Sequence, residues 1–130
     1  MEFSSDKPIY LQMADRLMDE IVADVYQAES RIPSVREYAV SLGVNANTAV
    51  KAYDQLASEG IIYNKRGLGY FVAQGAKKQI TKARKKDFMK IRLPELARQM
   101  SLLGITVEEV GQELEECLSQ QQAKGSVASI

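Results

Sequence analysis

A short polar segment, Asn45-Ala46-Asn47-Thr48, carries side chains that could read the edges of nucleic-acid bases. An asparagine amide can form two hydrogen bonds with adenine, and an alanine methyl can contact the methyl group of thymine. Lys51 follows one helical turn later, within reach of a phosphate or a guanine. A helix that enters the major groove presents such residues in its first turn. The segment therefore predicts the leading turn of a DNA-recognition helix.

The same residues also have interpretations that involve no ligand. Asn45 stands where an ordinary helix N-cap would stand. Asn47, Thr48 and Lys51 could equally form a solvated helix face. The elements around the segment decide between these alternatives.

A second group of polar residues precedes this segment. Ser34 and Glu37 have the spacing of a capping box, in which a hydroxyl and a carboxylate each accept a backbone N–H at the helix start. Arg36 falls in the first turn of the same helix, where the helix terminus and a basic side chain both favour phosphate. Ser34 and Arg36 are therefore candidate DNA contacts, and a solvent-exposed arginine without a partner is the alternative for Arg36.

Basic residues meet glycines in the segment from Lys65 to Gly69, between two runs of strand-forming residues. Gly67 and Gly69 remove side chains from the turn, so a hairpin here could approach a DNA backbone or minor groove closely. Lys65 and Arg66 bring positive charge to the tip, and Tyr70 opens the second run. A tight turn would explain the glycines alone, but the two basic residues favour nucleic-acid contact.

Three helices and this hairpin are needed to position the polar residues. Apolar spacing predicts helices over about 8–26, 35–42 and 46–59, and Gly43 closes the middle one. The link of about three residues between the second and third helices is typical of a helix-turn-helix. A hairpin directly after it predicts a winged helix-turn-helix domain over residues 1–75.

A second helical region is predicted over residues 76–120. Pro94 must end or kink its first helix, Gly104 stops that helix, and a capping box at Thr106 opens the last one. The remaining residues, 121–130, are predicted to be a flexible tail. The fold class is therefore mainly α (α+β), a winged helix-turn-helix domain with a small C-terminal two-helix dimerisation unit.

Apolar residues of this second region are too many for two short helices to bury between themselves. They are Phe88, Ile91, Leu96, Met100, Leu103, Val107, Val110 and Leu114. We expect them to form a homodimer interface, and packing against the winged-helix domain is the alternative. A two-fold dimer of winged helices would bind a palindromic site on double-stranded DNA.

The charge of the chain is unevenly distributed although its formal net charge is zero. Residues 61–92 carry ten basic side chains and one acidic side chain, whereas residues 1–30 carry two basic and seven acidic ones. Such asymmetry is typical of a surface for a polyanionic partner, and a solvated helix surface is the alternative. The basic run of residues 77–86 would either extend the phosphate contacts or form a solvated helix face, and the sequence leaves both open.

Several classes of function find little support in the composition. There is no histidine, Cys117 is the single cysteine, and no glycine-rich phosphate loop is present, so we expect neither an enzyme nor a metal or other cofactor. No secretory signal or membrane-length apolar run is visible, which predicts a cytoplasmic protein. A winged helix that docks on another protein instead of DNA is the remaining alternative.

The motifs together resemble a known family. "PSVRE", "LGVNxNT", "AYxxLxxEG" and "RGxGYFV" follow one another in fixed order over about 40 residues, as in the N-terminal winged-helix domain of GntR-family bacterial transcriptional regulators. "PIYLQMADRL" resembles the first helix of that family. The segment "RLPELARQMSLLGITVEEV" is similar to the YtrA-like subfamily, whose members carry a small helical dimerisation unit in place of a large effector domain.

The resemblance implies a homodimeric regulator, commonly a repressor, with DNA contacts at Arg36, at Asn45, Asn47 and Thr48, and at the hairpin residues Arg66, Gly67 and Gly69. Many family members have arginine at the positions of Ala46 and Val50, and neither is basic here. We therefore expect a readout that favours A·T pairs and relies on phosphate contacts. Any small-molecule effector would bind near the dimer interface or between the domains, and no set of residues identifies it.

Overall fold

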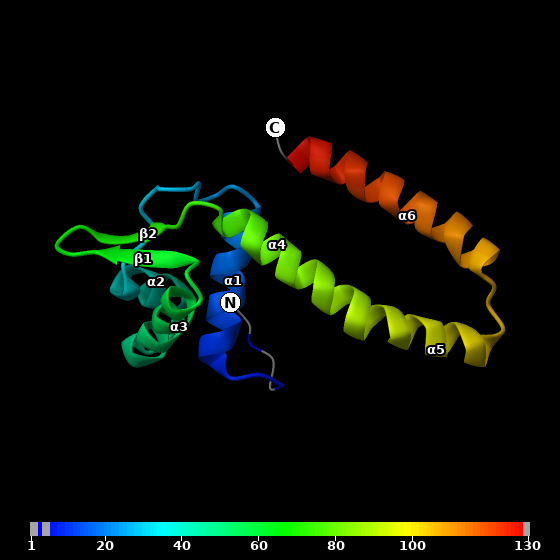
Figure 1. The fold of residues 1–130 in the computed structure, drawn as a ribbon, viewed down its shortest axis with the longest axis horizontal. Helices are drawn as coiled ribbons and strands as arrows, with labels where there is room; N and C mark the ends of the chain where they lie inside the picture. Colours follow the sequence, from blue (N-terminus) through cyan, green and yellow to red (C-terminus); the bar gives the residue numbers. More distant parts are fainter. Residues whose placement is uncertain (1–2, 4–5, 129–130) are drawn as a thin grey trace. The chain divides into compact units, whose positions relative to one another are not determined.

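The structure, a computed structural model, describes residue 3 and residues 6–128 (Figure 1). The chain divides into two compact units, unit 1 over Met1–Lys85 and unit 2 over Lys86–Ile130. Unit 1 contains the elements α1 (Ile9–Val22), α2 (Val35–Leu42), α3 (Ala46–Ser58), β1 (Ile62–Lys65), β2 (Gly69–Val72) and most of α4 (Ala76–Asp87). This order confirms the predicted winged helix-turn-helix, with three helices followed by an antiparallel hairpin.

The corner between α2 and α3 is built by local capping. Ser34 Oγ accepts the Glu37 backbone N–H at 3.1 Å, and the Ser34 backbone N–H donates to the Glu37 carboxylate at 3.0 Å. Gly43 then adopts a left-handed conformation, φ 66°, which ends α2. Asn45 Oδ1 accepts the Asn47 backbone N–H at 2.8 Å and opens α3. The capping box, the glycine stop and the asparagine cap are all confirmed.

The first helix ends at Val22, four residues before the predicted end. Asp24 takes the left-handed conformation, φ 64°, and its N–H donates to the carbonyl of Ile21. The N–H of Val25 donates to the carbonyl of Glu20, which completes a Schellman ending without a glycine. Val25 therefore lies outside the helix and is exposed, not on its apolar face as its spacing predicted.

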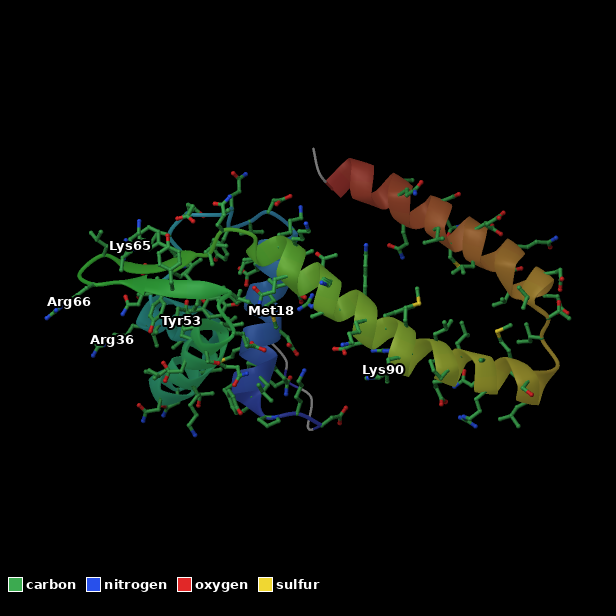
Figure 2. All side chains as sticks on the ribbon, viewed as in Figure 1. Met18, Arg36, Tyr53, Lys65, Arg66 and Lys90 are labelled. Atoms are coloured by element: carbon green, nitrogen blue, oxygen red, sulfur yellow. The ribbon has the colours of Figure 1, made fainter. Side chains whose placement is uncertain are left out.

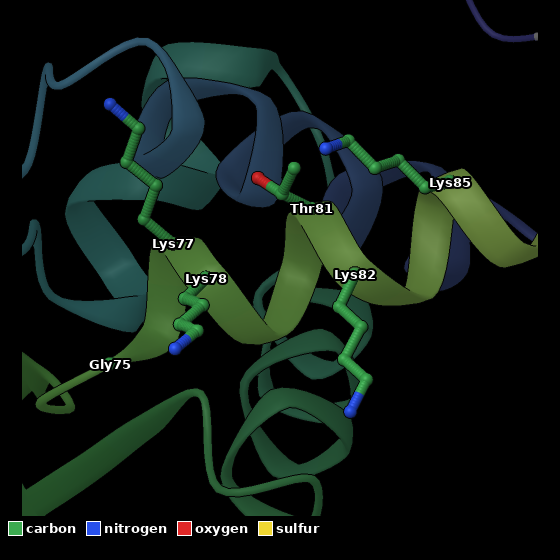
Figure 3. Close-up of a pocket in the computed structure, with 6 residues that line it drawn as sticks. All are labelled: Gly75, Lys77, Lys78, Thr81, Lys82 and Lys85. Carbon is green, nitrogen blue, oxygen red and sulfur yellow. The ribbon is translucent and has the colours of Figure 1, made fainter.

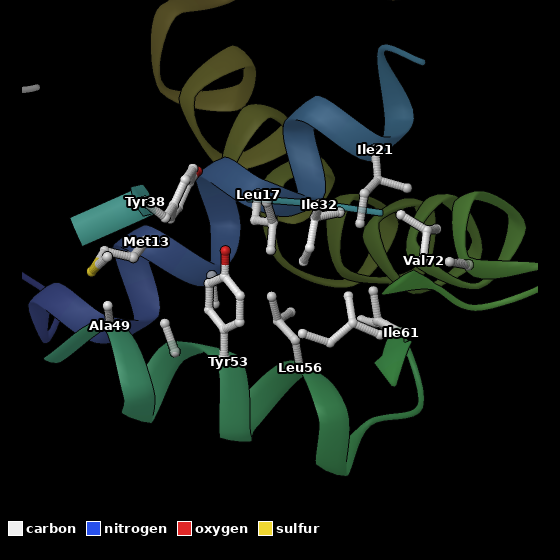
Figure 4. Close-up of a cluster of buried hydrophobic side chains, with 14 of the residues drawn as sticks. Met13, Leu17, Ile21, Ile32, Tyr38, Ala49, Tyr53, Leu56, Ile61 and Val72 are labelled. Carbon is white, nitrogen blue, oxygen red and sulfur yellow. The ribbon is translucent and has the colours of Figure 1, made fainter. Parts of the chain in front are cut away.

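The core of unit 1 lies between α1, α3 and the hairpin. Met13 and Leu17 of α1 face Tyr53 and Leu56 of α3, and Val72 of β2 is buried at the same cluster (Figure 4). All five are essentially inaccessible to solvent. Burial of each such side chain contributes about 1.5–3 kcal/mol, so this cluster holds the helices in place.

The hairpin is joined to the rest of unit 1 along the outer edge of β2. Ile62 pairs with Val72 and Lys65 with Gly69, which leaves a loop of residues 66–68. On the other edge of β2, residues 29–32 run alongside it, with a β-bridge between Arg31 and Phe71. No motif or spacing in the sequence indicates this third, strand-like segment. It makes the wing part of the core fold instead of a free arm.

Unit 1 extends into α4, beyond the boundary predicted at residue 75. Ala76 and Ile80 of α4 are buried in the core. Arg84 donates to the Asp19 carboxylate at 2.6 Å and to the carbonyl of Asp15 at 3.1 Å. The first turns of this basic helix therefore belong to the winged-helix unit.

Unit 2 contains a π-helical segment over Phe88–Arg92, then α5 (Leu93–Leu103) and α6 (Val107–Ala128). The helix predicted to end or kink near residue 93 instead passes through the π-helical turn, and Pro94 lies in the first turn of α5, where its missing N–H is not needed. The last helix reaches Ala128, so it includes residues predicted to belong to the tail. Across the described residues, no helix is both long enough and apolar enough to cross a membrane.

Candidate nucleic-acid interface

The first turn of α3 presents its polar residues to solvent. Asn45, Ala46, Asn47 and Lys51 are exposed and Thr48 is half-buried. The inward face of the same helix is apolar, with Ala49, Ala52, Tyr53 and Leu56 buried. Among the described residues, the side chains of Asn47 and Lys51 have no hydrogen-bond or ion-pair partner. This turn is therefore free to contact another molecule.

The first turn of α2 adds one unpaired cation. Arg36 is exposed, and no carboxylate of the described chain forms an ion pair with it. Ser34, half-buried, uses its oxygen and its backbone N–H in the capping box, so its first role is to open α2. Hydrogen bonds from Ser34 lower the pKa of the Glu37 carboxyl, with a smaller lowering from the positive charge of Arg31. Glu37 is therefore ionised at neutral pH and stabilises the cap.

The wing carries positive charge on a rigid frame. Gly67, φ 79°, and Gly69, φ 109°, adopt conformations that favour glycine, so the turn depends on them. Lys65 Nζ lies 4.5 Å from the centre of the Phe71 ring, a cation–π contact on one face of the hairpin. Arg66 is exposed at the tip without an ionic partner in the described chain. Figure 2 shows Arg36 and Arg66 projecting from the same end of unit 1.

Tyr70 contributes to packing more than to an open surface. Its ring meets Tyr53 edge-on, with centroids 5.1 Å apart and planes at 83°. The Tyr53 hydroxyl in turn donates to the carbonyl of Pro33. Burial raises the pKa of the Tyr53 phenol well above its usual range. This chain of contacts links the wing, α3 and the entrance of α2, so it fixes the candidate DNA contacts relative to one another.

The basic run on α4 separates into paired and unpaired side chains. Lys77 donates to the Asp24 carboxylate at 2.9 Å, and Arg84 is held by Asp19. Lys78 and Lys82 have no acidic partner within the described residues and project together from one side of α4, beside an open hollow of its surface (Figure 3). The paired residues serve to fasten α4 to α1. Whether the unpaired ones extend the phosphate contacts stays a prediction.

The predicted dimerisation residues are accessible in the structure. Leu103 is 72% exposed and Val107 is 73% exposed, and Met100 and Val110 are only half-buried. No described side chain of unit 2 is buried. The four remaining candidates, Phe88, Ile91, Leu96 and Leu114, are exposed as well. Unit 2 therefore presents an apolar surface without a core of its own.

One residue that the sequence analysis passed over lies beside the wing. Arg31 is exposed and bridges to Phe71 on the outer edge of β2. Its side chain lies so close to Gly69 that a β-carbon placed there would be 3.1 Å from Arg31 Nε. Spacing could not have identified Arg31, because its position depends on a pairing between segments about 40 residues apart.

Comparison with known proteins gives consistent results for this site. The model of the gntR family of bacterial regulatory proteins matches residues 9–72, which span α1 to the end of β2. The HTH-type transcriptional regulator YhcF of Bacillus subtilis (strain 168) is 37% identical over 109 residues, covering 84% of this chain and 88% of YhcF. The HTH-type transcriptional repressor YtrA of the same organism is 30% identical, covering 86% of this chain and 85% of YtrA.

Solved structures show the same architecture. A GntR-family regulator from Bacteroides thetaiotaomicron superposes with a TM-score of 0.74 and 48% identity, over 86% of this chain and 98% of that one. The DNA-binding domain of AraR, in complex with its operator ORX1, superposes with a TM-score of 0.52 and 28% identity, over 55% of this chain and 93% of that one. The likeness to the first structure includes unit 2 residues, whereas the likeness to the second covers about half of the chain.

Proposed function

This chain belongs to the gntR family of bacterial regulatory proteins as a YtrA-like, DNA-binding transcriptional regulator, and from this premise we propose that it is a repressor that binds a palindromic operator as a homodimer. The observation that carries the proposal is the exposed first turn of α3, whose Asn47 and Lys51 have no partner among the described residues. Polar groups left without partners at the start of a recognition helix are available to base edges and phosphates.

In the proposed complex, α3 enters the major groove by its first turn. Asn47 would bond an adenine, Ala46 would contact a thymine methyl, and Thr48 and the N-cap Asn45 would lie beside the backbone. Ala46 and Val50, where a basic residue would favour guanine, are apolar, which supports a preference for A·T pairs. Lys51 would add a contact one turn further along the helix.

Phosphate contacts would surround this readout. Arg36 would bind the backbone on one side of the groove, and Arg66 and Lys65 of the wing would bind it on the other. Gly67 and Gly69 keep the tip of the hairpin narrow, so that it can approach the duplex. Ser34 and Tyr70 act mainly by holding these groups in place, through the capping box and the contact with Tyr53.

A homodimer is supported by the composition of unit 2. Its apolar side chains have no core within the described unit, and burial against a second copy would remove them from water. The relative YtrA is named a repressor, which is the basis for proposing repression here. Two winged helices related by a two-fold axis would recognise two half-sites about one helical turn apart, or a multiple of it.

The test is selection of duplexes by the full-length protein, followed by fluorescence anisotropy with the selected sequence and with a scrambled one. We expect an A·T-rich palindrome. Asn47→Ala and Lys51→Gln should each weaken binding to the selected site by ~5- to 150-fold, because each loses a base or phosphate contact worth about 1–3 kcal/mol. Lys77→Gln is the matched control, because Lys77 is already paired with Asp24.

The same experiment can reject the proposal in parts. A G·C-rich selected core would overturn the A·T preference. Equal effects of Lys51→Gln and Lys77→Gln would remove the role of α3. Absence of any salt-sensitive affinity for DNA would reject DNA binding itself and favour a winged helix that docks on a protein. A reporter gene under the selected site, with and without the regulator, then tests repression.

A further inference from the structure

Arg31 is fixed in space by backbone pairing on both sides. The N–H of Ile32 donates to the carbonyl of Tyr70 at 3.0 Å, and the N–H of Val72 donates to the carbonyl of Ser30 at 3.0 Å. Arg31 itself forms the β-bridge with Phe71. Its Cα therefore cannot drift away from the wing, although the residue belongs to the loop that leads into α2.

The side chain of Arg31 lies against Gly69 of the wing. A β-carbon at Gly69 would lie 3.1 Å from Nε, 3.6 Å from Nη2 and 3.8 Å from Cζ of Arg31. The first of these distances is tighter than ordinary contacts between side chains. An alanine at Gly69 would require the Arg31 side chain to shift by a few tenths of an ångström, and it would strain the backbone there, φ 109°.

The charge of Arg31 is not neutralised by its neighbours. The carboxylate of Glu37 is close enough for Arg31 to contribute to its lowered pKa, but its hydrogen bonds come from Ser34. The carboxylate of Glu29 accepts the Tyr63 hydroxyl at 2.5 Å. Arg31 forms no ion pair with any residue that the structure describes. An exposed guanidinium thus lies beside Gly69 of the wing, near the first turn of α2, with no ion-pair partner among the described residues.

We propose that Arg31 is a further DNA-binding residue, which holds a backbone phosphate between the wing and α2 while Gly69 leaves room for its guanidinium. The proposal rests on the proposed function and deepens it. A guanidinium presents planar N–H donors that match a phosphate oxygen pair, and the paired backbone of Arg31 keeps the base of this side chain beside the wing. The contact positions the wing on the backbone and does not read sequence.

Arg31 and Gly69 come from two different parts of the winged helix. Arg31 comes before α2 and Gly69 lies in the hairpin, so a phosphate on Arg31 would touch both parts of the winged helix at once. A purely structural Arg31 would show its effect in stability. A phosphate-binding Arg31 would show it in the dependence of DNA affinity on salt.

The experiment compares Arg31→Gln, Arg31→Lys, Gly69→Ala and the double variant in the full-length protein, with Arg36→Gln and Lys77→Gln as references. Binding to the selected operator and to a random duplex is measured across a salt series, and thermal unfolding of each free variant checks the fold. Arg31→Gln should weaken both DNAs by a similar factor, roughly tenfold or more, since a charge-assisted bond is lost. The slope of log K against log salt should fall by about 0.9 for each phosphate contact removed.

The double variant tests whether Arg31 and Gly69 act together in DNA binding. Gly69→Ala strains its own backbone in every background, but it should weaken DNA binding much less in the Arg31→Gln protein than in the wild type. Arg31→Lys should restore the salt slope and only part of the affinity, because a lysine lacks the planar donor pair.

The outcomes separate this proposal from the proposed function. An unchanged slope for Arg31→Gln beside a reduced slope for Arg36→Gln overturns the role of Arg31 and leaves DNA binding intact. Additive effects of Gly69→Ala and Arg31→Gln overturn the coupling. Absence of salt-sensitive binding by the wild type rejects the proposed function itself.

Discussion

Unit 1 and unit 2 differ in how they bury their apolar residues. Unit 1 closes a core from α1, α2, α3, the hairpin and the first turns of α4, with Leu56 and Ile62 almost wholly inaccessible to solvent. Unit 2 has two helices and a π-helical turn, and none of its described side chains is buried. Since stability comes mainly from apolar burial, unit 1 has its own source of stability and unit 2 must find one outside itself. The candidate DNA contacts therefore lie in unit 1, and the proposed dimer interface lies in unit 2.

The largest expected effect comes from opening the core of unit 1. Leu56→Ala removes a side chain that is fully buried between α1 and α3, and we expect a loss of about 2–5 kcal/mol in the free energy of unfolding. Urea unfolding followed by circular dichroism measures it. The control is Val50→Ala in the same helix, where the valine is 42% exposed and the change should stay within about 0.5 kcal/mol.

Equal effects of the two substitutions would contradict this picture of unit 1. Such a result would mean that α3 is not held by its buried face. The contrast between units would then lose its physical basis, because both would depend on contacts outside themselves.

The next effect tests unit 2 as an interface. Leu114→Glu places a charge on the apolar face of α6, so we expect the protein to dissociate to monomers at micromolar concentration. A monomer can occupy one half-site only, and its affinity for the palindrome should fall by ~100-fold or more, because the second binding event is no longer intramolecular. Light scattering and anisotropy measure the two effects.

Gln112→Glu is the matched control for this experiment, because it adds the same charge at an exposed polar position of the same helix. It should leave the dimer intact. A wild-type protein that is monomeric at micromolar concentration would exclude the dimer, and the apolar face of unit 2 would then need another partner.

The two units also differ in how far the sequence could predict them. The corner from Ser34 to Asn45 followed from local chemistry, because caps and a left-handed glycine depend on residues three or four positions apart. The hairpin followed from its glycines and strand-forming runs. These local signals were enough to identify a winged helix and the first turn of α3 as its candidate contact.

Three features of the fold were not predictable from the spacing of residues along the sequence. Nothing in the spacing around Arg31 indicates that its loop pairs with β2. The end of α1 at Val22 was missed because the left-handed residue that follows it, Asp24, stands where a glycine is usual. The burial of Ile80 joined α4 to unit 1, although the run around it reads as a solvated basic helix. For Arg31 and Ile80 a distant contact, not a local preference, decides the structure.

The smallest expected effect concerns a polar contact at the edge of the unit 1 core. The Tyr38 hydroxyl donates to the Glu20 carboxylate at 2.6 Å and ties α2 to α1. Burial raises the pKa of the Tyr38 phenol well above its usual range, and the bond to Glu20 raises it further. A phenol whose pKa is higher in the folded than in the unfolded protein stabilises the fold below the unfolded pKa of about 10 and loses that contribution as the pH rises above it.

Tyr38→Phe should therefore cost about 0.5–1.5 kcal/mol at pH 7, the usual contribution of one hydrogen bond, and should reduce the loss of stability between pH 10 and pH 12. Tyr63→Phe is the comparison, because the Tyr63 hydroxyl also bonds a carboxylate, Glu29, which raises the Tyr63 pKa, but this bond lies at the exposed surface of the wing and should contribute less. Urea unfolding at pH 7 and pH 11 measures both. If Tyr38→Phe and the wild type lose the same free energy of unfolding at pH 11, the bond between Tyr38 and Glu20 does not control that loss. The stability that distinguishes unit 1 from unit 2 would then come from its apolar core alone.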